Sequence, residues 1–374
     1  MDRRKFLLTS LGAAGALAVA SCTSSKKSSS TSGGPGPVDL SKASPRPTVR
    51  ASVALDFGAP SPFAYTGGPG YQLMAFIYDA LLQEDADHKM LPLLASRYQK
   101  SADGLTYTFE IRENARWHDG QPVTPDDVKF TYDYFRTQTL SSTLVAQPRD
   151  VTGAVVTGPR TVDIRIDRPV VNFLHDVASV LPIVPKHIWQ PVTDAAKTTG
   201  PETAVGCGPY KLGSYTAGEG TYLFVANDDY YLGKPFVKRV EMHPVSDDLA
   251  ALQAGEIDVG STDVFGVPSE TLAPFRSDDE TFGIQETKTG IGVIFKWNVG
   301  KGGALGDVRF RQAMARGINR DDIVKRLTRG NSVPGSSGYL PPGNDWHVDT
   351  EPYAYDPAAA NRLLDQAGYT RSGG

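Results

Sequence analysis

Six histidines and two cysteines are the side chains of this chain best suited to metal binding or nucleophilic catalysis. The histidines are scattered, with no H-x-x-x-H pair and no cysteine–histidine cluster: His88, His118, His175, His187, His243 and His347. A structural metal site needs closer spacing, so we expect no metal ligands. Neither the G-x-S-x-G turn of many hydrolases nor the G-x-x-x-x-G-K-[ST] phosphate loop occurs. The sequence therefore predicts no catalytic residues, no cofactor and no enzyme activity.

Two pairs of neighbouring polar residues could suggest catalysis but have simpler explanations. His118 and Asp119 precede Gly120, and residues of these types form tight turns through their backbone geometry. Asp126 and Asp127 follow a Thr-Pro dipeptide, which is typical of a helix start with acids in the first turn. Both pairs are interpreted as structural.

The elements that would position any site alternate between strands and helices. Residues 105–111 alternate apolar and polar types, as a half-buried strand does, and a helix with an apolar face follows residue 125. Further strands are predicted at 162–166, 222–226, 237–242 and 257–259, and further helices at 247–254, 307–316, 320–329 and 356–368, the last burying Leu363 and Leu364. This mixture predicts an α/β body.

Composition limits the class of protein. The 374 residues are 40% hydrophobic and 21% charged, which is ordinary for a globular chain and excludes a wholly disordered or multi-span membrane protein. The net charge of −4 comes without a long basic block, so we expect no nucleic-acid partner.

The N-terminus has the layout of an export signal. Arg3, Arg4 and Lys5 precede a short apolar run that ends at Cys22, so residues 1–21 are predicted to be a signal peptide. The paired arginines resemble a twin-arginine signal, although the general secretory pathway also fits, and Val-Ala-Ser-Cys resembles a lipobox. Lipidation of Cys22 would leave Cys207 without a disulfide partner. Residues 22–47 are rich in Ser, Gly and Pro and are predicted to be a flexible tether.

Four segments carry a family likeness. Residues 103–135, 205–215, 251–259 and 307–324 resemble, in order and spacing, the extracytoplasmic solute-binding proteins of ABC importers, in the cluster that binds oligopeptides, dipeptides, nickel and some oligosaccharides. The resemblance implies a two-lobed clamp of the class II periplasmic-binding-protein type. Lobe I would span residues 48–286, with an extra subdomain at about 76–204, and lobe II would begin at 287 with a strand over 290–298.

The likeness stops early. In the family, the segment similar to residues 355–369 is followed by the rest of the second lobe and a return to the first. We therefore expect residues 287–374 to form an incomplete lobe II and the chain to be a fragment of a longer protein; a genuinely short protein is the alternative. The family's acidic partner for a peptide amino terminus would lie beyond residue 374.

Ligand-binding candidates come from the resemblance and from the need of a peptide-sized ligand for apolar walls. They are Phe57 and Tyr65 in the loop after the first strand, Trp117, Cys207, Trp297 and Asn298. Aromatics at strand ends are core residues more often than ligand contacts, and Cys207 could equally be a buried, inert thiol.

The resemblance implies a monomeric binding component of an ABC importer, held by lipid on the outer face of the cytoplasmic membrane. It would capture peptides by hinge closure and deliver them to the permease and its ATPase. The alternatives are a carrier of a nickel chelate or oligosaccharide, and a surface sensor or interaction protein without a transport role.

Overall fold

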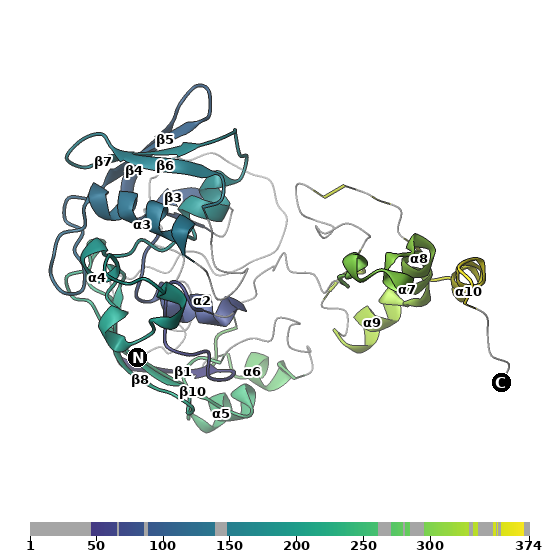
Figure 1. Ribbon diagram of the computed structural model, residues 1–374. Coiled ribbons are helices and arrows are strands. Elements are labelled where there is room, and N and C mark those ends of the chain that lie inside the picture. The colour runs from purple at the N-terminus through teal and green to yellow at the C-terminus, as the bar shows by residue number, and fades with distance from the viewer. Residues whose placement is uncertain are drawn as a thin grey trace, which may run out of the picture. The chain divides into compact units, whose positions relative to one another are not determined.

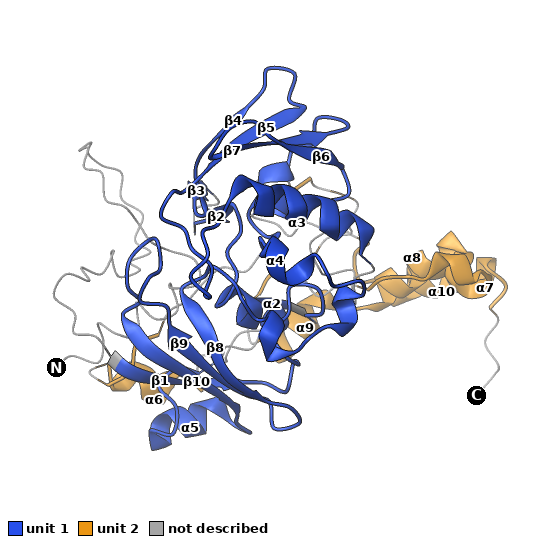
Figure 2. Cartoon of the chain, turned by 60° about the vertical axis from the view of Figure 1, so that its left-hand side comes forward, with its two compact units in different colours: residues 1–261 blue, residues 262–374 orange. Residues whose placement is uncertain are grey.

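The computed structural model describes residues 46–65, 67–85, 89–138, 148–260, 271–279, 281–284, 295–328, 332–335, 347–348, 350 and 353–369. The chain divides into two compact units, Met1–Ser261 and Thr262–Gly374, coloured blue and orange in Figure 2. The predicted lobe boundary at 286/287 lies outside the described residues. So do the signal peptide, Cys22 and the tether up to residue 45, and all of these stay predictions.

The first sheet of unit 1 has the order β1-β10-β9-β8. These strands are β1 (Arg46–Val53), β8 (Tyr210–Thr216), β9 (Thr221–Ala226) and β10 (Val237–Pro244), and β1 runs parallel to β10. Helix α5 (Asp248–Ala254) begins at the cap Asp247 and ends at Gly255, whose φ of 71° is left-handed. The predicted strand at 257–259 is wrong as an element, because only Val259 bridges to β1.

The second sheet of unit 1 has the order β4-β5-β7-β6. Its strands are β4 (Ala95–Lys100), β5 (Thr106–Ile111), β6 (Val151–Val156) and β7 (Thr161–Ile166). Alternate residues of β5 and β7 are buried, as the period-two pattern predicts, and helix α3 (Pro125–Thr137) packs near β6 and β7 (Figure 1). Thr124 and Asp127 form a reciprocal capping box at the start of α3, which confirms the predicted helix start.

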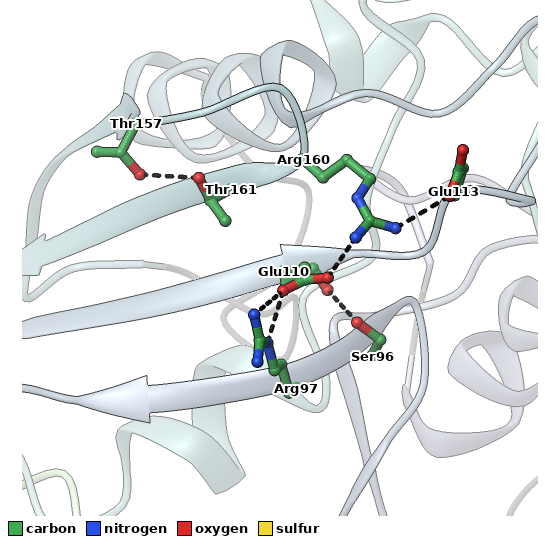
Figure 3. A network of polar contacts seen from close by, with 7 residues as sticks. All are labelled: Ser96, Arg97, Glu110, Glu113, Thr157, Arg160 and Thr161. Atoms are coloured by element: carbon green, nitrogen blue, oxygen red, sulfur yellow. Dashed lines mark hydrogen bonds and ion pairs between the residues drawn. The ribbon is translucent and has the colours of Figure 1, made fainter.

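The other face of this sheet carries an ion-pair network (Figure 3). Arg97 and Arg160 both reach Glu110, at 2.5 Å and 2.7 Å, and Arg160 also lies 3.3 Å from Glu113. Glu110 is the best-buried member, with 14% of its side chain exposed. The network therefore links β4, β5 and the start of β7 across a polar surface, although such exposed pairs add little stability individually.

Short elements connect the two sheets of unit 1. They are α2 (Gly67–Ala75), the hairpin β2 (Leu82–Glu84) and β3 (Met90–Pro92), a π-helical turn η3 (Leu174–Ala178), α4 (Lys186–Trp189), and the 3₁₀ turns η4 (Ala195–Lys197) and η5 (Pro201–Thr203). Phe63 packs its ring against Phe135 of α3 and Trp189 of α4, with centroid distances of 4.3 Å and 4.6 Å. These aromatic contacts bind the connecting segments into one core.

The described part of unit 2 is helical. Its elements are α6 (Ala273–Ser277), η6 (Val299–Lys301), α7 (Gly303–Gly306), α8 (Val308–Gly317), α9 (Arg320–Arg326) and α10 (Pro357–Gln366). Asp307, Asn319 and Asp356 cap α8, α9 and α10. Helices α8 and α10 pack together with Ala313 and Ala360 buried.

Two details of unit 2 differ from expectation. Leu363 and Leu364, predicted to be buried, are only half-buried, and the buried side chain of α10 is that of Ala360. Of the strand predicted at 290–298, residues 290–294 lie outside the described residues, and 295–298 have no regular structure.

Candidate functional site

One edge of the first sheet gathers several loops. Strands β1 and β10 run parallel and end together, with Val53 opposite Pro244. The β8–β9 turn lies at the same edge, because β9 runs antiparallel to β10. Val259 also lies near this edge, because it forms a parallel bridge with Ala51, close to the end of β1. Ligands of open α/β sheets bind outside the carboxyl ends of the strands. We take this carboxyl edge, formed by loop 54–65 and the β8–β9 turn, as the candidate site.

Asp56 fixes the shape of the carboxyl edge. Its Oδ1 accepts hydrogen bonds from the Gly58 amide and the Tyr215 hydroxyl, both at 2.8 Å, and its Oδ2 accepts from the Gly218 amide at 2.8 Å. The Tyr222 hydroxyl lies 3.1 Å from Oδ1. The bond from Gly58 is the largest influence that lowers the pKa of Asp56, so the carboxylate stays ionised. The loop after β1 is thereby tied to β8 and β9.

The exposed part of this loop is apolar. Leu55 is 54% exposed, and Phe57 is half-buried with its amide donating to the Tyr222 hydroxyl at 3.0 Å. Tyr215 and Tyr222 stack beneath it with ring centroids 5.0 Å apart. Because amide and hydroxyl donors already satisfy the Asp56 carboxylate, this side chain is not available as a base, and the loop offers apolar contact on a rigid support. This arrangement suits binding of a solute.

A second group of residues, which we call the junction, joins segments 76–79, 117–121 and 204–211. The His118 amide donates to the Gly206 carbonyl at 2.8 Å, and the Gly206 amide approaches His118 Nδ1 at 3.3 Å. His118 Nε2 lies 3.0 Å from the Gly208 carbonyl, and Lys211 Nζ donates to the His118 carbonyl at 2.9 Å. The histidine therefore links two loops that are about ninety residues apart in the chain.

These contacts determine the charge state of His118. Nδ1 faces an amide donor and must be a lone-pair acceptor, whereas Nε2 faces a carbonyl and must carry the proton. Burial lowers the pKa of His118 to about 4. At neutral pH the ring is therefore neutral and protonated on Nε2, and its partners give it a structural role.

Asp79 lies in the same junction and is buried. The Tyr231 hydroxyl donates to its Oδ2 at 2.6 Å, and its carbonyl accepts from the Ile183 amide at 2.9 Å. Burial raises the pKa of Asp79 to about 7. Burial also raises the pKa of the Cys207 thiol well above its ordinary value, with the Asp79 charge contributing, so the thiol stays protonated and unreactive.

Gly206 and Gly208 allow the junction to close. A Cβ atom on Gly206 would lie 1.9 Å from the Ile77 carbonyl oxygen, and one on Gly208 would lie 2.7 Å from the same atom. The Gly208 amide donates to that oxygen at 2.8 Å. The two glycines on either side of Cys207 are thus required for the close approach of the two backbones.

The predicted ligand-binding residues fall into three places. Phe57 lies on the carboxyl edge, and Tyr65 closes the same loop, buried with its ring edge-on to Tyr71 at 5.6 Å. Trp117 and Cys207 lie in the junction, 2% and 0% exposed. The Trp117 indole N–H has no acceptor within the described residues. The alternative of a buried thiol matches the position of Cys207.

The remaining two candidates belong to unit 2. Trp297 is half-buried, with its ring 6.4 Å from Phe295 and 6.5 Å from Phe310, and Asn298 is exposed at the start of η6. Each unit therefore contributes aromatic candidates, and their contact with a ligand stays a prediction.

Two acidic residues with clear structural roles, Asp56 and Asp79, were not identified from the sequence. Apart from the local bond from Gly58, the donors to Asp56 come from a hairpin more than 150 residues away and meet it only in the folded sheet. Asp79 left a clearer signal, because it is a lone acid within the apolar run 76–82, which is the pattern of a buried carboxyl group.

Within the ranges that the structure describes, no cluster of three or more His, Cys, Asp or Glu side chains has the geometry to hold a metal ion. Over the same ranges, no helix is long and apolar enough to cross a membrane.

Comparison with known proteins agrees with this architecture. Among relatives, a putative ABC transporter peptide-binding protein of Brucella ovis is 31% identical over 323 residues, which cover 84% of this chain and 58% of the relative. The fold is similar to AgaA of A. tumefaciens R10, solved with agropinic acid (TM-score 0.72, 23% identity, 86% of this chain and 64% of that one). It is also similar to Helicobacter pylori DppA, solved with the peptide STSA (TM-score 0.69, 21% identity, 87% and 67%).

These matches confirm the mixed α/β fold of periplasmic binding proteins. The chain spans less than two thirds of the length of the Brucella relative. A family model described as bacterial extracellular solute-binding proteins, family 5 Middle, matches residues 89–374, about three quarters of the chain. The family resemblance of the four sequence segments is thereby confirmed, and the chain belongs to the family 5 bacterial extracellular solute-binding proteins.

Proposed function

We propose that this protein is the ligand-capturing component of an ABC importer for peptides and that it has no enzymatic role. The match of the family model over residues 89–374 carries the proposal. The Brucella relative is named as a peptide-binding protein and the Helicobacter structure contains a peptide, and both favour peptides over other solutes. The apolar loop at the carboxyl edge, held rigid by Asp56, supports binding as the activity.

The mechanism we infer is closure of two lobes on the solute, with lobe I spanning residues 48–286 and lobe II beginning at 287. Contacts from Phe57 and Tyr65 in the first lobe and from Trp297 and Asn298 in the second would be made together only in the closed state. A ligand that binds the closed state better shifts the population towards it. The permease and its ATPase would then recognise the closed form.

Calorimetric titration with di-, tri- and tetrapeptides tests this proposal. Phe57→Ala and Trp297→Ala should each weaken peptide binding about tenfold or more, because each removes an aromatic wall. Val155→Ala, at an exposed position of the second sheet, is the matched control and should change affinity less than twofold. If nickel–histidine or an oligosaccharide binds and no peptide does, the carrier alternative is favoured. If none of these solutes binds, the sensor alternative is favoured.

We also propose export through residues 1–21 and lipid attachment at Cys22, with residues 22–47 as the tether of a monomer. The sequence Val-Ala-Ser-Cys supports this. Cys22→Ser should move the protein from the membrane pellet to the soluble extracytoplasmic fraction of its host. Persistence of the variant in the membrane pellet after an alkaline carbonate wash would contradict a lipid anchor at this residue.

A further inference from the structure

A cavity of about 500 Å³ lies between helices α8 and α10 of unit 2. Gln312 and Arg316 line it from α8, one turn apart, and Arg362 and Gln366 line it from α10 with the same spacing. Tyr353, in the segment before α10, completes the polar lining. We call this space the α8–α10 groove.

The described lining is rich in hydrogen-bond donors. It contains two guanidinium groups, two carboxamides and a phenol, and no carboxylate belongs to it. Arginine and glutamine side chains in such a set match the oxygens of an anion, and the fork of a guanidinium suits carboxylate or phosphate in particular.

Several contacts hold the lining in place. The Arg316 guanidinium lies over the Tyr353 ring, 5.4 Å from its centroid. The Gln312 carboxamide donates to the Tyr353 hydroxyl at 3.3 Å, and Arg320 donates to the Tyr353 carbonyl at 2.9 Å. Tyr353 itself has a φ of 41°, which is unusual for a bulky side chain and is found where the surroundings enforce it, often at binding sites.

The surrounding helices extend the positive charge. Residues 295–328 contain eight lysines and arginines against three aspartates, whereas the whole chain carries a net charge of −4. A cationic region within an acidic protein attracts anions from solution and raises their local concentration.

From the residues that line it, the contacts that hold Arg316 and the local positive charge, we infer that the α8–α10 groove is an anion site, lined by residues other than those proposed for solute binding. Its ligand is a phosphate or carboxylate group, carried either by a small free anion or by an anionic lipid headgroup. Arg362 and Arg316 would donate to its oxygens, and the carboxamides of Gln312 and Gln366 would complete the contacts.

The test uses the full chain and two probes, at constant ionic strength. Inorganic phosphate is titrated by calorimetry, and vesicles of phosphatidylcholine with and without phosphatidylglycerol are used in flotation. We expect saturable binding of at least one probe and a loss of about tenfold or more in affinity for Arg362→Gln. Arg362 is exposed on α10, so this variant should fold. Arg362→Lys, which keeps the charge, should recover part of the loss.

Arg326→Gln is the matched control, because Arg326 lies on α9, is 77% exposed and pairs with Asp322 outside the groove. Binding of phosphate would identify the ligand of the groove as a small free anion. Binding of the vesicles without binding of phosphate would identify it as a lipid headgroup. Saturation by neither probe, or an equal loss of affinity in Arg326→Gln, would overturn the inference. Peptide binding is measured in a separate titration, so a loss of anion affinity at the groove can be distinguished from a loss of peptide affinity at the solute site.

Discussion

Two buried side chains of the junction should respond to pH in opposite directions. The pKa of Asp79 rises from 3.8 to about 7, so between these values the folded chain keeps a proton that the unfolded chain releases. Stability then falls as pH rises. The pKa of His118 falls from 6.5 to about 4, so between these values the unfolded chain holds the extra proton and stability rises with pH. The two effects oppose each other from about pH 4 to 6.5.

Asp79→Asn should remove one of these opposing effects. The amide keeps an oxygen acceptor for the Tyr231 hydroxyl but cannot ionise. We expect the free energy of unfolding of the variant, relative to the natural protein, to increase by up to about 1.4 kcal/mol per pH unit between pH 4 and 7 and to level off above pH 7. Urea unfolding at pH 5, 6, 7 and 8 measures this. A difference that is constant across these pH values would show that Asp79 does not bind a proton in the window.

His118→Gln should show the reverse trend. The glutamine can donate to the Gly208 carbonyl, but the Gly206 amide loses its Nδ1 acceptor. We expect a destabilisation of about 1–3 kcal/mol above pH 6.5, because a buried donor is left unsatisfied, and a smaller effect as the pH falls towards 4, where His118 is charged in both states. The same urea series measures it. The double variant with Asp79→Asn should have the flattest profile, and a destabilisation by His118→Gln that does not shrink in acid would contradict this assignment.

At the scale of elements, the junction depends on glycines that allow two backbones to touch. Gly206→Ala would place a methyl group 1.9 Å from the Ile77 carbonyl oxygen, which is a backbone atom and cannot turn aside. We expect a loss of about 3 kcal/mol or more in the free energy of unfolding. Chemical denaturation followed by circular dichroism measures it.

Gly153→Ala in β6 is the control for this substitution. A Cβ at Gly153 meets nothing within 4 Å, so we expect a change within about 0.5 kcal/mol. Equal effects of the two substitutions would mean that the close approach at Gly206 relaxes at little cost.

Elements with local signals were predictable from the sequence. The alternation at 105–111, the Thr-Pro-Asp-Asp start of α3 and the caps at Asp247, Asn319 and Asp356 all act within a few residues of their elements. What escaped prediction depends on distant partners. The parallel pairing of β1 with β10 joins residues about 190 positions apart. At Val259 the structure has a single β-bridge, and the apolar residues around it in the sequence do not distinguish such a bridge from a strand.

The candidate site was predictable to the same degree. The loop containing Phe57 and Tyr65 was identified, and the structure places Phe57 at the carboxyl edge. The role of Asp56 was not identified, because its hydroxyl and amide donors from Tyr215 and Gly218 meet it only in the folded sheet. Burial of Cys207 within the junction matches one of its two interpretations, and no local pattern could have decided between them.

At the scale of the whole molecule, the described residues of the two units differ in how much apolar surface they bury. Unit 1 has an extended core that includes Phe63, Phe109 and Trp189, each less than 2% exposed. In the described part of unit 2, the buried hydrophobic residues are Phe275, Ala313 and Ala360. Large apolar side chains such as Leu327, 73% exposed, lie at its surface. Since burial of apolar area drives folding, the described helices of unit 2 should contribute far less to stability than the core of unit 1.

This difference should appear directly in hydrogen exchange. We expect backbone amides of α8 and α10 to exchange roughly a hundredfold or more faster than those of β5 and β7. The fully buried side chains of these two helices are the small ones of Ala313 and Ala360, so the helices can open without unfolding unit 1. Exchange of the full chain followed by mass spectrometry of peptides measures both sets together, and α3 within unit 1 is an internal helical control. Equal protection of α8 and β7 would mean that the units unfold as one cooperative body. If α8 and α10 alone gain protection when phosphate is added, the stabilisation would arise at the α8–α10 groove.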